Sequence, residues 1–202
     1  MEVEALVKEM TGASKVLIFD HTFRSTESDP KVLSNHMGIK NKAAAPAAMV
    51  HADYSKDSGP KRLSQLQESG AYTTTATLNE EDWKKRFQIV NVWRPTSENP
   101  VINHPLAVCD TTSVSADDMK LFRLEFPTRT GEIQTLTTES AAKHAWFYYP
   151  QMTRDEALVF NLYGGETCKT GFCFHTAFEH PATPLDAPIR TSVEVRTVAF
   201  FD

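Results

Sequence analysis

Thr191-Ser-Val-Glu-Val-Arg-Thr-Val-Ala-Phe-Phe201, close to the carboxyl end of the chain, is rich in β-branched and aromatic residues and predicts a β-strand. Similar short runs precede it, and turn residues such as those at 94–95 and 164–165 separate them. These runs cover residues 87–93, 106–109, 133–137, 145–149, 157–163 and 171–178. Many short strands with few helices indicate a sandwich or barrel. We therefore expect a mainly β protein, an all-β double sheet with a few decorating helices.

The first third of the chain carries weaker strand signals. Leu6 and Met10 stand at helical spacing before Gly12, which predicts a short first helix, and Asn79 with Asp82 three residues later suggests a capped helix start. The other expected elements are a strand over 15–20, an irregular connection over 21–48, a short strand over 49–53 and a helix that begins at 59–60 and continues through 66. We expect these helices to decorate the sheets.

Composition limits the class of protein and its compartment. The chain has 202 residues, enough for one sizeable core, so we expect a single domain over 1–202. A net charge of -5 without a long basic run argues against nucleic acid as a partner. No run of 18 apolar residues or signal peptide is present, and the sparse cysteines (Cys109, Cys168 and Cys173) favour a reducing compartment. We expect a cytoplasmic protein without a membrane span.

The triplet His51-Ala52-Asp53 is a candidate metal-binding motif. Residues i and i+2 of an extended strand project from the same face, so His51 and Asp53 can bind one ion. A second, distant histidine would complete the two-histidine, one-carboxylate triad of non-haem Fe(II) oxygenases, which leaves metal positions open for co-substrate and dioxygen. Taken alone the triplet is weak, because a hydrogen-bonded polar pair near a loop would look the same.

His175 is the candidate for the distant ligand. It lies inside an apolar run, Phe172-Cys-Phe-His-Thr-Ala-Phe178, where burial of an imidazole without a partner is unfavourable. A core histidine bonded to the backbone is the alternative interpretation. His180 is a rival ligand, although it stands at the strand exit before Pro181.

Arg190 and Ser192 stand two residues apart and therefore on one face of the last predicted strand. A guanidinium group binds carboxylates through two parallel hydrogen bonds, so this pair suits the distal carboxylate of 2-oxoglutarate. Arg196 lies on the same face and is an alternative anchor.

Several blocks, in order, resemble a known family. They are Ala13 to Thr22, Val50 to Ser55, Gln88 to Pro95, Pro105 to Asp110, Trp146 to Pro150, Asp155 to Phe160, His175 to Phe178, Asp186 to Arg190 and Ser192 to Arg196. Together they resemble the fungal hydroxylase/desaturase AsaB family, which is related to the cephalosporin methoxylase CmcJ component and to gibberellin desaturase-like proteins. The resemblance implies an Fe(II)- and 2-oxoglutarate-dependent oxygenase on a double-stranded β-helix (a cupin-like jelly roll).

Carried over by position, the resemblance implies that His51, Asp53 and His175 bind Fe(II) and that Arg190 with Ser192 holds 2-oxoglutarate. Asn91 is a further candidate for the co-substrate site. The substrate-pocket candidates are Trp93, Arg94 and Tyr149. The implied reaction is hydroxylation or desaturation of a small hydrophobic secondary metabolite with dioxygen, and the oligomeric state stays open.

Three departures from the family pattern accompany this resemblance. The chain begins where the family usually has several tens of preceding residues, so we expect a form that lacks the family's amino-terminal segment. Residues 161–165 stand where a Lys-x-Tyr-Asp-Ser run is common, and Phe174 stands where proline commonly precedes the distal histidine. Two alternatives follow: a truncated, non-catalytic homologue that binds ligand or metal without turnover, and a cupin-like metal enzyme with different chemistry. The second usually needs more histidines, and the chain has no His-x-His.

Overall fold

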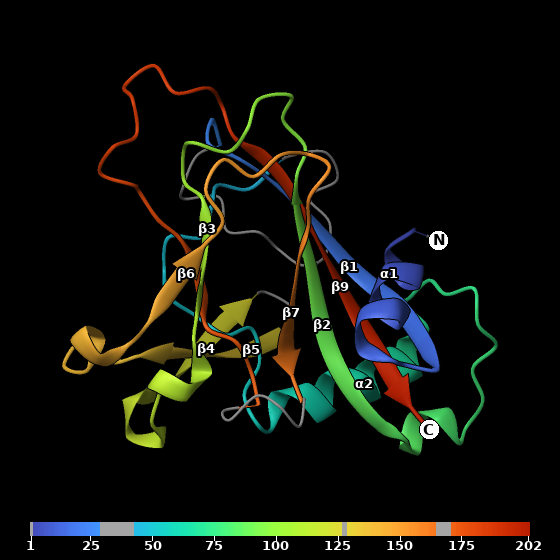
Figure 1. Cartoon of the computed structure of the whole chain (residues 1–202). Coiled ribbons are helices and arrows are strands. Elements are labelled where there is room, and N and C mark those ends of the chain that lie inside the picture. Colours follow the sequence, from blue (N-terminus) through green and yellow to red (C-terminus); the bar gives the residue numbers. More distant parts are fainter. Residues whose placement is uncertain (1, 29–42, 127–128, 165–170) are drawn as a thin grey trace.

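The structure, a computed structural model, describes residues 2–28, 43–126, 129–164 and 171–202 (Figure 1). Its helices and strands, in chain order, are α1 (Glu2–Thr11), β1 (Lys15–Ser25), α2 (Ser58–Ser69), β2 (Arg86–Pro95), β3 (Leu106–Cys109), β4 (Met119–Phe126), β5 (Arg129–Leu136), β6 (Trp146–Tyr148), β7 (Leu158–Tyr163), β8 (His175–Ala177) and β9 (Thr191–Phe201). Short 3-10 helices lie between them: η1 (Asp82–Lys84), η2 (Thr111–Ser113), η3 (Ala116–Asp118) and η4 (Ala141–Lys143). No helix in these ranges is both long enough and apolar enough to cross a membrane.

The larger sheet has the strand order β1-β9-β2-β7, and each pairing is antiparallel (Figure 1). In its register Arg196 of β9 lies opposite Asn91 of β2 and Asp20 of β1, while Glu194 lies opposite Trp93. Opposite residues of antiparallel strands project from the same face. One face of this sheet therefore carries a row of polar side chains across its middle.

A bulge in β1 decides which of its side chains join that row. Leu17 pairs with Val198 on the face that carries Arg196, but the register shifts between Ile18 and Asp20. The extra residue turns Asp20 onto the face of Leu17, although their spacing of three would otherwise place them on opposite faces. Asp20 and the alternate residues that follow it thus project from the face that carries Arg196.

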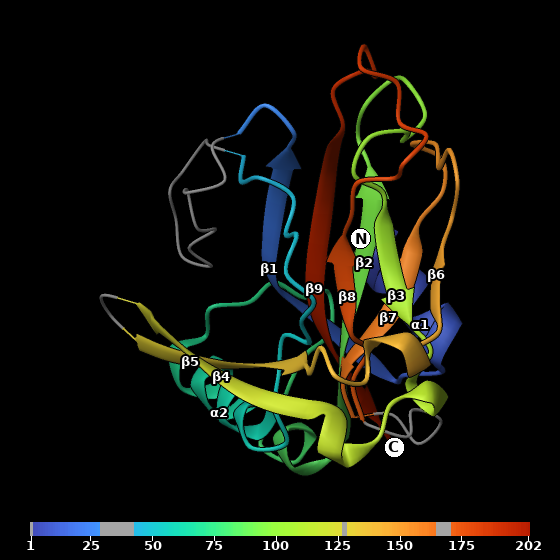
Figure 2. The same cartoon turned by 90° about the vertical axis from the view of Figure 1, so that its left-hand side faces the viewer.

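The smaller sheet has the order β6-β3-β8 and faces the larger one, as the view turned by 90° shows (Figure 2). Trp93 of the larger sheet packs in one apolar cluster with Leu106 of β3, and the ring of Phe160 on β7 contacts that of His175 on β8. Strands β4 and β5 form a separate antiparallel hairpin, which is joined to the segment at 51–53 by the bridge between Ala52 and Gln134.

The two helices cover different faces of the larger sheet. Val7 of α1 packs against Val90, Val92 and Ala199 on the outer face, whereas Leu63 and Leu66 of α2 pack on the inner face. The partners of α2 are Leu17, Ile89, Leu162, Val198 and Phe200. The inner face is therefore apolar where α2 covers it and polar in the rows next to it.

Most of the expected elements are present. The helices at 2–11 and 58–69 are confirmed, as are strands at 15–20, 86–95, 106–109, 146–148 and 158–163, and β9 has the predicted bounds. The irregular connection was wrong for 21–25, which continue β1, and its residues 29–42 lie outside the described ranges. The strand over 49–53 is reduced to two isolated bridges, the strand over 171–178 to three residues, and β4 was not predicted. Asn79 and Asp82 begin a single 3-10 turn, η1.

Candidate metal centre

One backbone pairing brings together the three residues proposed as metal ligands. His51 and His175 form an isolated antiparallel bridge, in which each backbone N–H donates to the carbonyl of the other at 3.1 and 2.9 Å. Residues that are directly opposite in such a pair project from the same face. Asp53, two residues after His51, joins them from the same segment. The i and i+2 spacing seen in the sequence thus acts together with a long-range bridge.

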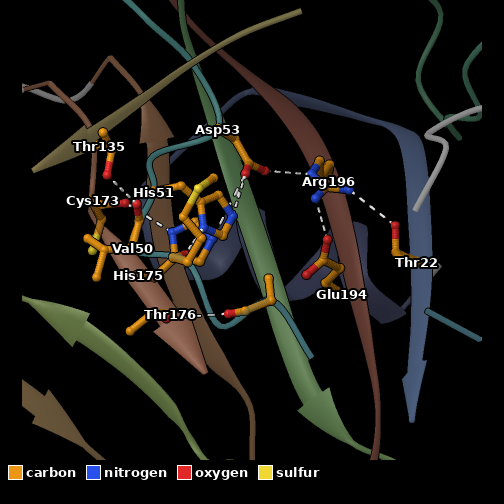
Figure 3. A network of polar contacts seen from close by, with 12 residues as sticks. Thr22, Val50, His51, Asp53, Thr135, Cys173, His175, Thr176, Glu194 and Arg196 are labelled. Carbon is orange, nitrogen blue, oxygen red and sulfur yellow. Dashed lines mark hydrogen bonds and ion pairs between the residues drawn. The ribbon is translucent and has the colours of Figure 1, made fainter. Parts of the chain in front are cut away.

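The side chains of the triad converge (Figure 3). One ligand-type atom from each of His51, Asp53 and His175 lies within 4.8 Å of the other two. Oδ1 of Asp53 is 3.3 Å from Nε2 of His51 and 3.9 Å from Nε2 of His175, and the two imidazole centroids are 4.4 Å apart. These donors match the two-histidine, one-carboxylate set that binds non-haem Fe(II).

The backbone fixes which nitrogen of each imidazole faces the centre. Nδ1 of His51 lies 2.7 Å from the carbonyl oxygen of Met49, and Nδ1 of His175 lies 3.1 Å from that of Cys173. A carbonyl can only accept, so each Nδ1 donates and each Nε2 of a neutral ring carries the lone pair. A histidine that ligates a metal usually holds its second nitrogen in this way. Both rings are therefore oriented for metal binding through Nε2.

The electrostatics of the three groups differ. Burial and the neighbouring ring of His51 lower the pKa of His175 to about 4, so this imidazole is neutral at pH 7. Burial also acts to lower the pKa of His51, but the hydrogen bond and charge of Asp53 outweigh it and raise that pKa. Burial opposes the charge of Asp53, yet the Arg196 guanidinium holds the pKa of Asp53 well below its usual value. A carboxylate beside a neutral imidazole suits a divalent cation.

Arg196 is engaged by protein acceptors on all three of its nitrogens (Figure 3). Nε donates to Oδ2 of Asp53 at 2.7 Å, Nη1 donates to Oδ2 of Asp20 at 3.1 Å and to Oγ1 of Thr22 at 3.3 Å, and Nη2 donates to Glu194. Burial acts against its charge, but the surrounding carboxylates raise the pKa of Arg196 well above its usual value. This arrangement favours Arg190 over Arg196 as a carboxylate anchor.

Arg190 is buried but only partly satisfied. Its Nη2 donates to Oγ of Ser192 at 2.9 Å, while Nε and Nη1 are buried without a hydrogen-bond partner among the described residues. Burial and the charge of Arg24 lower its pKa to about 10, which still leaves a cation at pH 7. Unpaired donors on a buried cation are unfavourable, and a carboxylate ligand would satisfy them. Arg190 and Ser192, which were predicted as a pair, are thus in contact, and two nitrogens of Arg190 have no partner among the described residues.

Asn91 is a second buried group without partners. Its side chain is 1% exposed, and neither its Oδ1 nor its Nδ2 finds a partner in the described ranges. It lies between Arg196 of β9 and Phe160 of β7 in the sheet register. Arg196 bonds to Asp53, and the ring of Phe160 is 4.9 Å from that of His175. The amide therefore stands among residues that touch two members of the triad.

The three residues predicted to line the substrate pocket lie in different surroundings. Trp93 is buried on the inner face, with the Arg190 guanidinium 5.1 Å from its ring centroid. Arg94 projects from the opposite face because neighbours on a strand alternate, and it donates to the carbonyl of Arg154. Tyr149 follows β6 and is 60% exposed. The structure thus places Trp93 on the inner face beside Arg190 and Arg94 on the opposite face, while Tyr149 is exposed to solvent.

His180, the rival ligand, is not part of the triad. Its Nδ1 accepts from the backbone N–H of Ala182 at 3.1 Å, and its ring stands beside those of Tyr148 and Phe178. The position of His180 at the end of the predicted strand, before Pro181, had made it the weaker candidate for the second histidine ligand.

Besides Asp20, two charged residues of the inner face were not predicted from the sequence. Glu194 bonds to Arg196 and forms an ion pair with Arg24 at 3.3 Å. Burial opposes its charge, but these two arginines lower the pKa of Glu194 to about 2. The alternation of Ser192, Glu194 and Arg196 could have revealed it. Arg24 gave no such signal, because its segment was expected to be irregular.

Fold and site together define a jelly-roll protein with a two-histidine, one-carboxylate constellation. A family model described as an oxidoreductase/YMDC permease-like domain (YDMC) matches residues 1–200. Similar curated proteins include the aspirochlorine biosynthesis protein N of Aspergillus oryzae, which is 38% identical over 59% of this chain and 50% of its own length. Alpha-ketoglutarate-dependent dioxygenase phiK of a fungal species (strain ATCC 74256) is 30% identical over 99% of this chain and 68% of its own. Other matching fungal proteins are named hydroxylase/desaturase.

A solved structure supports the same grouping. The iron and alpha-ketoglutarate-dependent endoperoxidase NvfI superposes with a TM-score of 0.78 at 28% identity, over 98% of this chain and 66% of that one. The likeness confirms the predicted mainly β jelly-roll fold. The chain therefore belongs to the family of the matching model, and it also belongs with the fungal family whose members are named hydroxylase/desaturase or Fe(II)/2-oxoglutarate-dependent dioxygenase. It spans half to about two thirds of the length of the first curated relatives it matches.

Proposed function

We propose that this chain is an Fe(II)- and 2-oxoglutarate-dependent dioxygenase that hydroxylates or desaturates a small hydrophobic secondary metabolite. The observation that carries the proposal is the triad of His51, Asp53 and His175, whose ligand atoms lie within 4.8 Å of one another with both Nε2 atoms turned inward. Directly before β9, the buried cation Arg190 keeps two donors without a partner among the described residues. A metal site and an unsatisfied carboxylate-binding group are what this co-substrate chemistry needs.

Each residue has a proposed role. His51, Asp53 and His175 hold Fe(II) and leave coordination positions open. Arg190 binds the distal carboxylate of 2-oxoglutarate through Nε and Nη1, and Ser192 keeps the guanidinium oriented through its bond to Nη2. Asn91, whose amide has no partner among the described residues, hydrogen-bonds the bound co-substrate.

Bound Fe(II) would supply the redox chemistry by which dioxygen is consumed, 2-oxoglutarate is converted to succinate and carbon dioxide, and a substrate C–H bond is oxidised. The chain supplies ligand orientation and charge. Phe160, whose ring lies 4.9 Å from that of His175, and the buried Trp93 beside Arg190 suit a hydrophobic substrate. Relatives named hydroxylase/desaturase support this reaction class, whereas NvfI is named an endoperoxidase.

The test is an anaerobic titration of the full chain with Fe(II) and then 2-oxoglutarate, followed by visible absorption for the charge-transfer band of the complex. We expect the band in the wild-type protein and in His180→Ala, and none in His175→Ala, with circular dichroism confirming that all three are folded. A folded wild-type protein without the band would contradict the proposal. Loss of the band in His180→Ala but not in His175→Ala would assign the second histidine differently.

The alternative function, a homologue that binds ligand or metal without turnover, predicts the band without succinate formation when oxygen is admitted. The names of the relatives do not favour it. We further propose that within its family the chain groups with the AsaB-type proteins, as its ordered sequence blocks suggest. The single domain over 1–202, the cytoplasmic location and the absence of a nucleic-acid partner stay predictions from composition.

A further inference from the structure

We infer that Arg196 is a positioning residue for Asp53: it binds one carboxylate oxygen and so leaves the other for the metal. This inference rests on the proposed function, because it assigns Asp53 to the iron site. It also assigns different roles to Arg190 and Arg196, two of the three arginines that are buried among the described residues. In it, Arg190 binds the co-substrate and Arg196 orients a metal ligand.

The carboxylate of Asp53 divides its two oxygens between different partners. Oδ2 accepts from Nε of Arg196 at 2.7 Å, whereas Oδ1 faces Nε2 of His51 at 3.3 Å and Nε2 of His175 at 3.9 Å. A carboxylate can bind a metal ion through one oxygen or through both. With Oδ2 directed toward the guanidinium, Asp53 presents Oδ1 to the two imidazoles, and binding through this one oxygen preserves the coordination positions that a facial triad leaves open.

Arg196 is itself fixed from several sides. Its side chain is 3% exposed, and Nη1 bonds to Asp20 and Thr22 of β1 while Nη2 bonds to Glu194. The β1 bulge turns Asp20 to this face, and Arg24 holds the second oxygen of Glu194 through its Nε, at 3.3 Å. An arginine with this many charge-assisted bonds has one orientation, so it transmits that orientation to Asp53.

The contrast is with Arg190, which lies directly before β9, the strand that carries Arg196. Arg190 has two nitrogens without partners in the described ranges, whereas each nitrogen of Arg196 has a protein acceptor. For Arg196 to bind an incoming carboxylate, it would have to give up one of its charge-assisted bonds to Asp53, Asp20 or Glu194. The geometry therefore gives the two arginines different tasks.

The experiment compares Arg196→Lys with Arg190→Lys, because both keep the charge and lose the guanidinium fork. Two affinities are measured without turnover: that of Mn(II) for the protein, and that of 2-oxoglutarate for protein saturated with Mn(II). For Arg196→Lys we expect the Mn(II) dissociation constant to rise about 10- to 100-fold, the range for partners of metal ligands, with 2-oxoglutarate affinity within about threefold of wild type. Arg190→Lys should give the reverse pattern. Arg94→Lys, on the outer face, is the matched control and should change neither.

Co(II) absorption gives a further readout, since the d–d bands report the ligand geometry: Arg196→Lys should shift them and Arg190→Lys should not. If Arg196→Lys does not fold, Glu194→Gln takes its place in the experiment. It weakens the bond between Glu194 and Arg196, so we expect the Mn(II) dissociation constant to rise at least about threefold. Unchanged Mn(II) affinity in a folded variant, or loss of 2-oxoglutarate affinity instead, overturns the inference. A wild-type protein that binds no metal would contradict the proposed function itself.

Discussion

The guanidinium of Arg190 lies over the indole ring of Trp93, 5.1 Å from the ring centroid, and both residues are buried. An aromatic face attracts a cation and also holds a planar group parallel to itself. Trp93 therefore limits the orientations in which Arg190 can present Nε and Nη1 to a ligand.

Replacing Trp93 by leucine tests this relationship. We expect the 2-oxoglutarate dissociation constant of the Mn(II)-loaded protein to rise about two- to thirtyfold, since a cation–π contact contributes roughly 0.5 to 2 kcal/mol. Isothermal titration calorimetry measures it. Metal affinity should stay unchanged, because the bonds that orient the three ligands among the described residues come from Met49, Cys173 and Arg196. Trp83→Leu is the control: Trp83 packs against Tyr72 and Phe200, so the change should lower stability but not co-substrate affinity.

Asn91→Leu should affect stability and binding in opposite directions. The amide of Asn91 is buried without a partner among the described residues, so an apolar side chain of similar size removes an unfavourable burial. We expect the free energy of unfolding of the ligand-free protein, measured with urea, to rise by about 1 kcal/mol, and the 2-oxoglutarate affinity to fall.

Asn161→Leu is the matched comparison. Nδ2 of Asn161 donates to the carbonyl of Gly171 at 2.9 Å, so its loss should destabilise the protein. If Asn91→Leu destabilises to the same extent, the Asn91 amide serves the fold and not a ligand.

Strand alternation and short spacing made much of the fold and site predictable. β9 was recognised from its β-branched run, and the same alternation places Ser192 and Arg196 on one face. The i and i+2 spacing of His51 and Asp53 predicted that they project together, which the structure shows. These features are local, so a single segment of sequence contains them.

Features that depend on contacts between distant segments were not predictable. The bulge between Ile18 and Asp20 places Asp20 on the face of Arg196, and the sequence of residues 15–25 alone does not predict this bulge. The segment at 51–53 forms bridges and no ladder because its partners, His175 and Gln134, belong to different elements. The partners of Arg196 were not predictable for the same reason. Its acceptors come from β1, β9 and the segment at 53, so the sequence alone indicated only an alternative anchor for the co-substrate.

Asp82 should make the protein acid-sensitive through bonds to Lys15, Asn79 and Lys85, none of which belongs to the candidate metal site. Its buried carboxylate accepts from Nζ of Lys15 at 2.8 Å, from the backbone N–H of Asn79 at 2.8 Å and from Nζ of Lys85 at 3.0 Å. The bond from Lys15, followed by those from Asn79 and Lys85, lowers the pKa of Asp82 below its ordinary value of 3.8. The bonds connect the start of β1, the η1 turn and the start of β2.

A carboxyl group with a lowered folded-state pKa stabilises the fold above its unfolded-state pKa, and this contribution is lost as the pH falls toward the folded-state value. Asp82→Asn should therefore lower the melting temperature most at pH 7, and the difference from wild type should shrink below about pH 5. Asp117→Asn, which alters an exposed carboxylate, should follow the wild-type curve throughout. A deficit in Asp82→Asn that stays constant from pH 7 to pH 3 would mean that Asp82 acts through its shape and neutral hydrogen bonds, because only the charged form responds to acid.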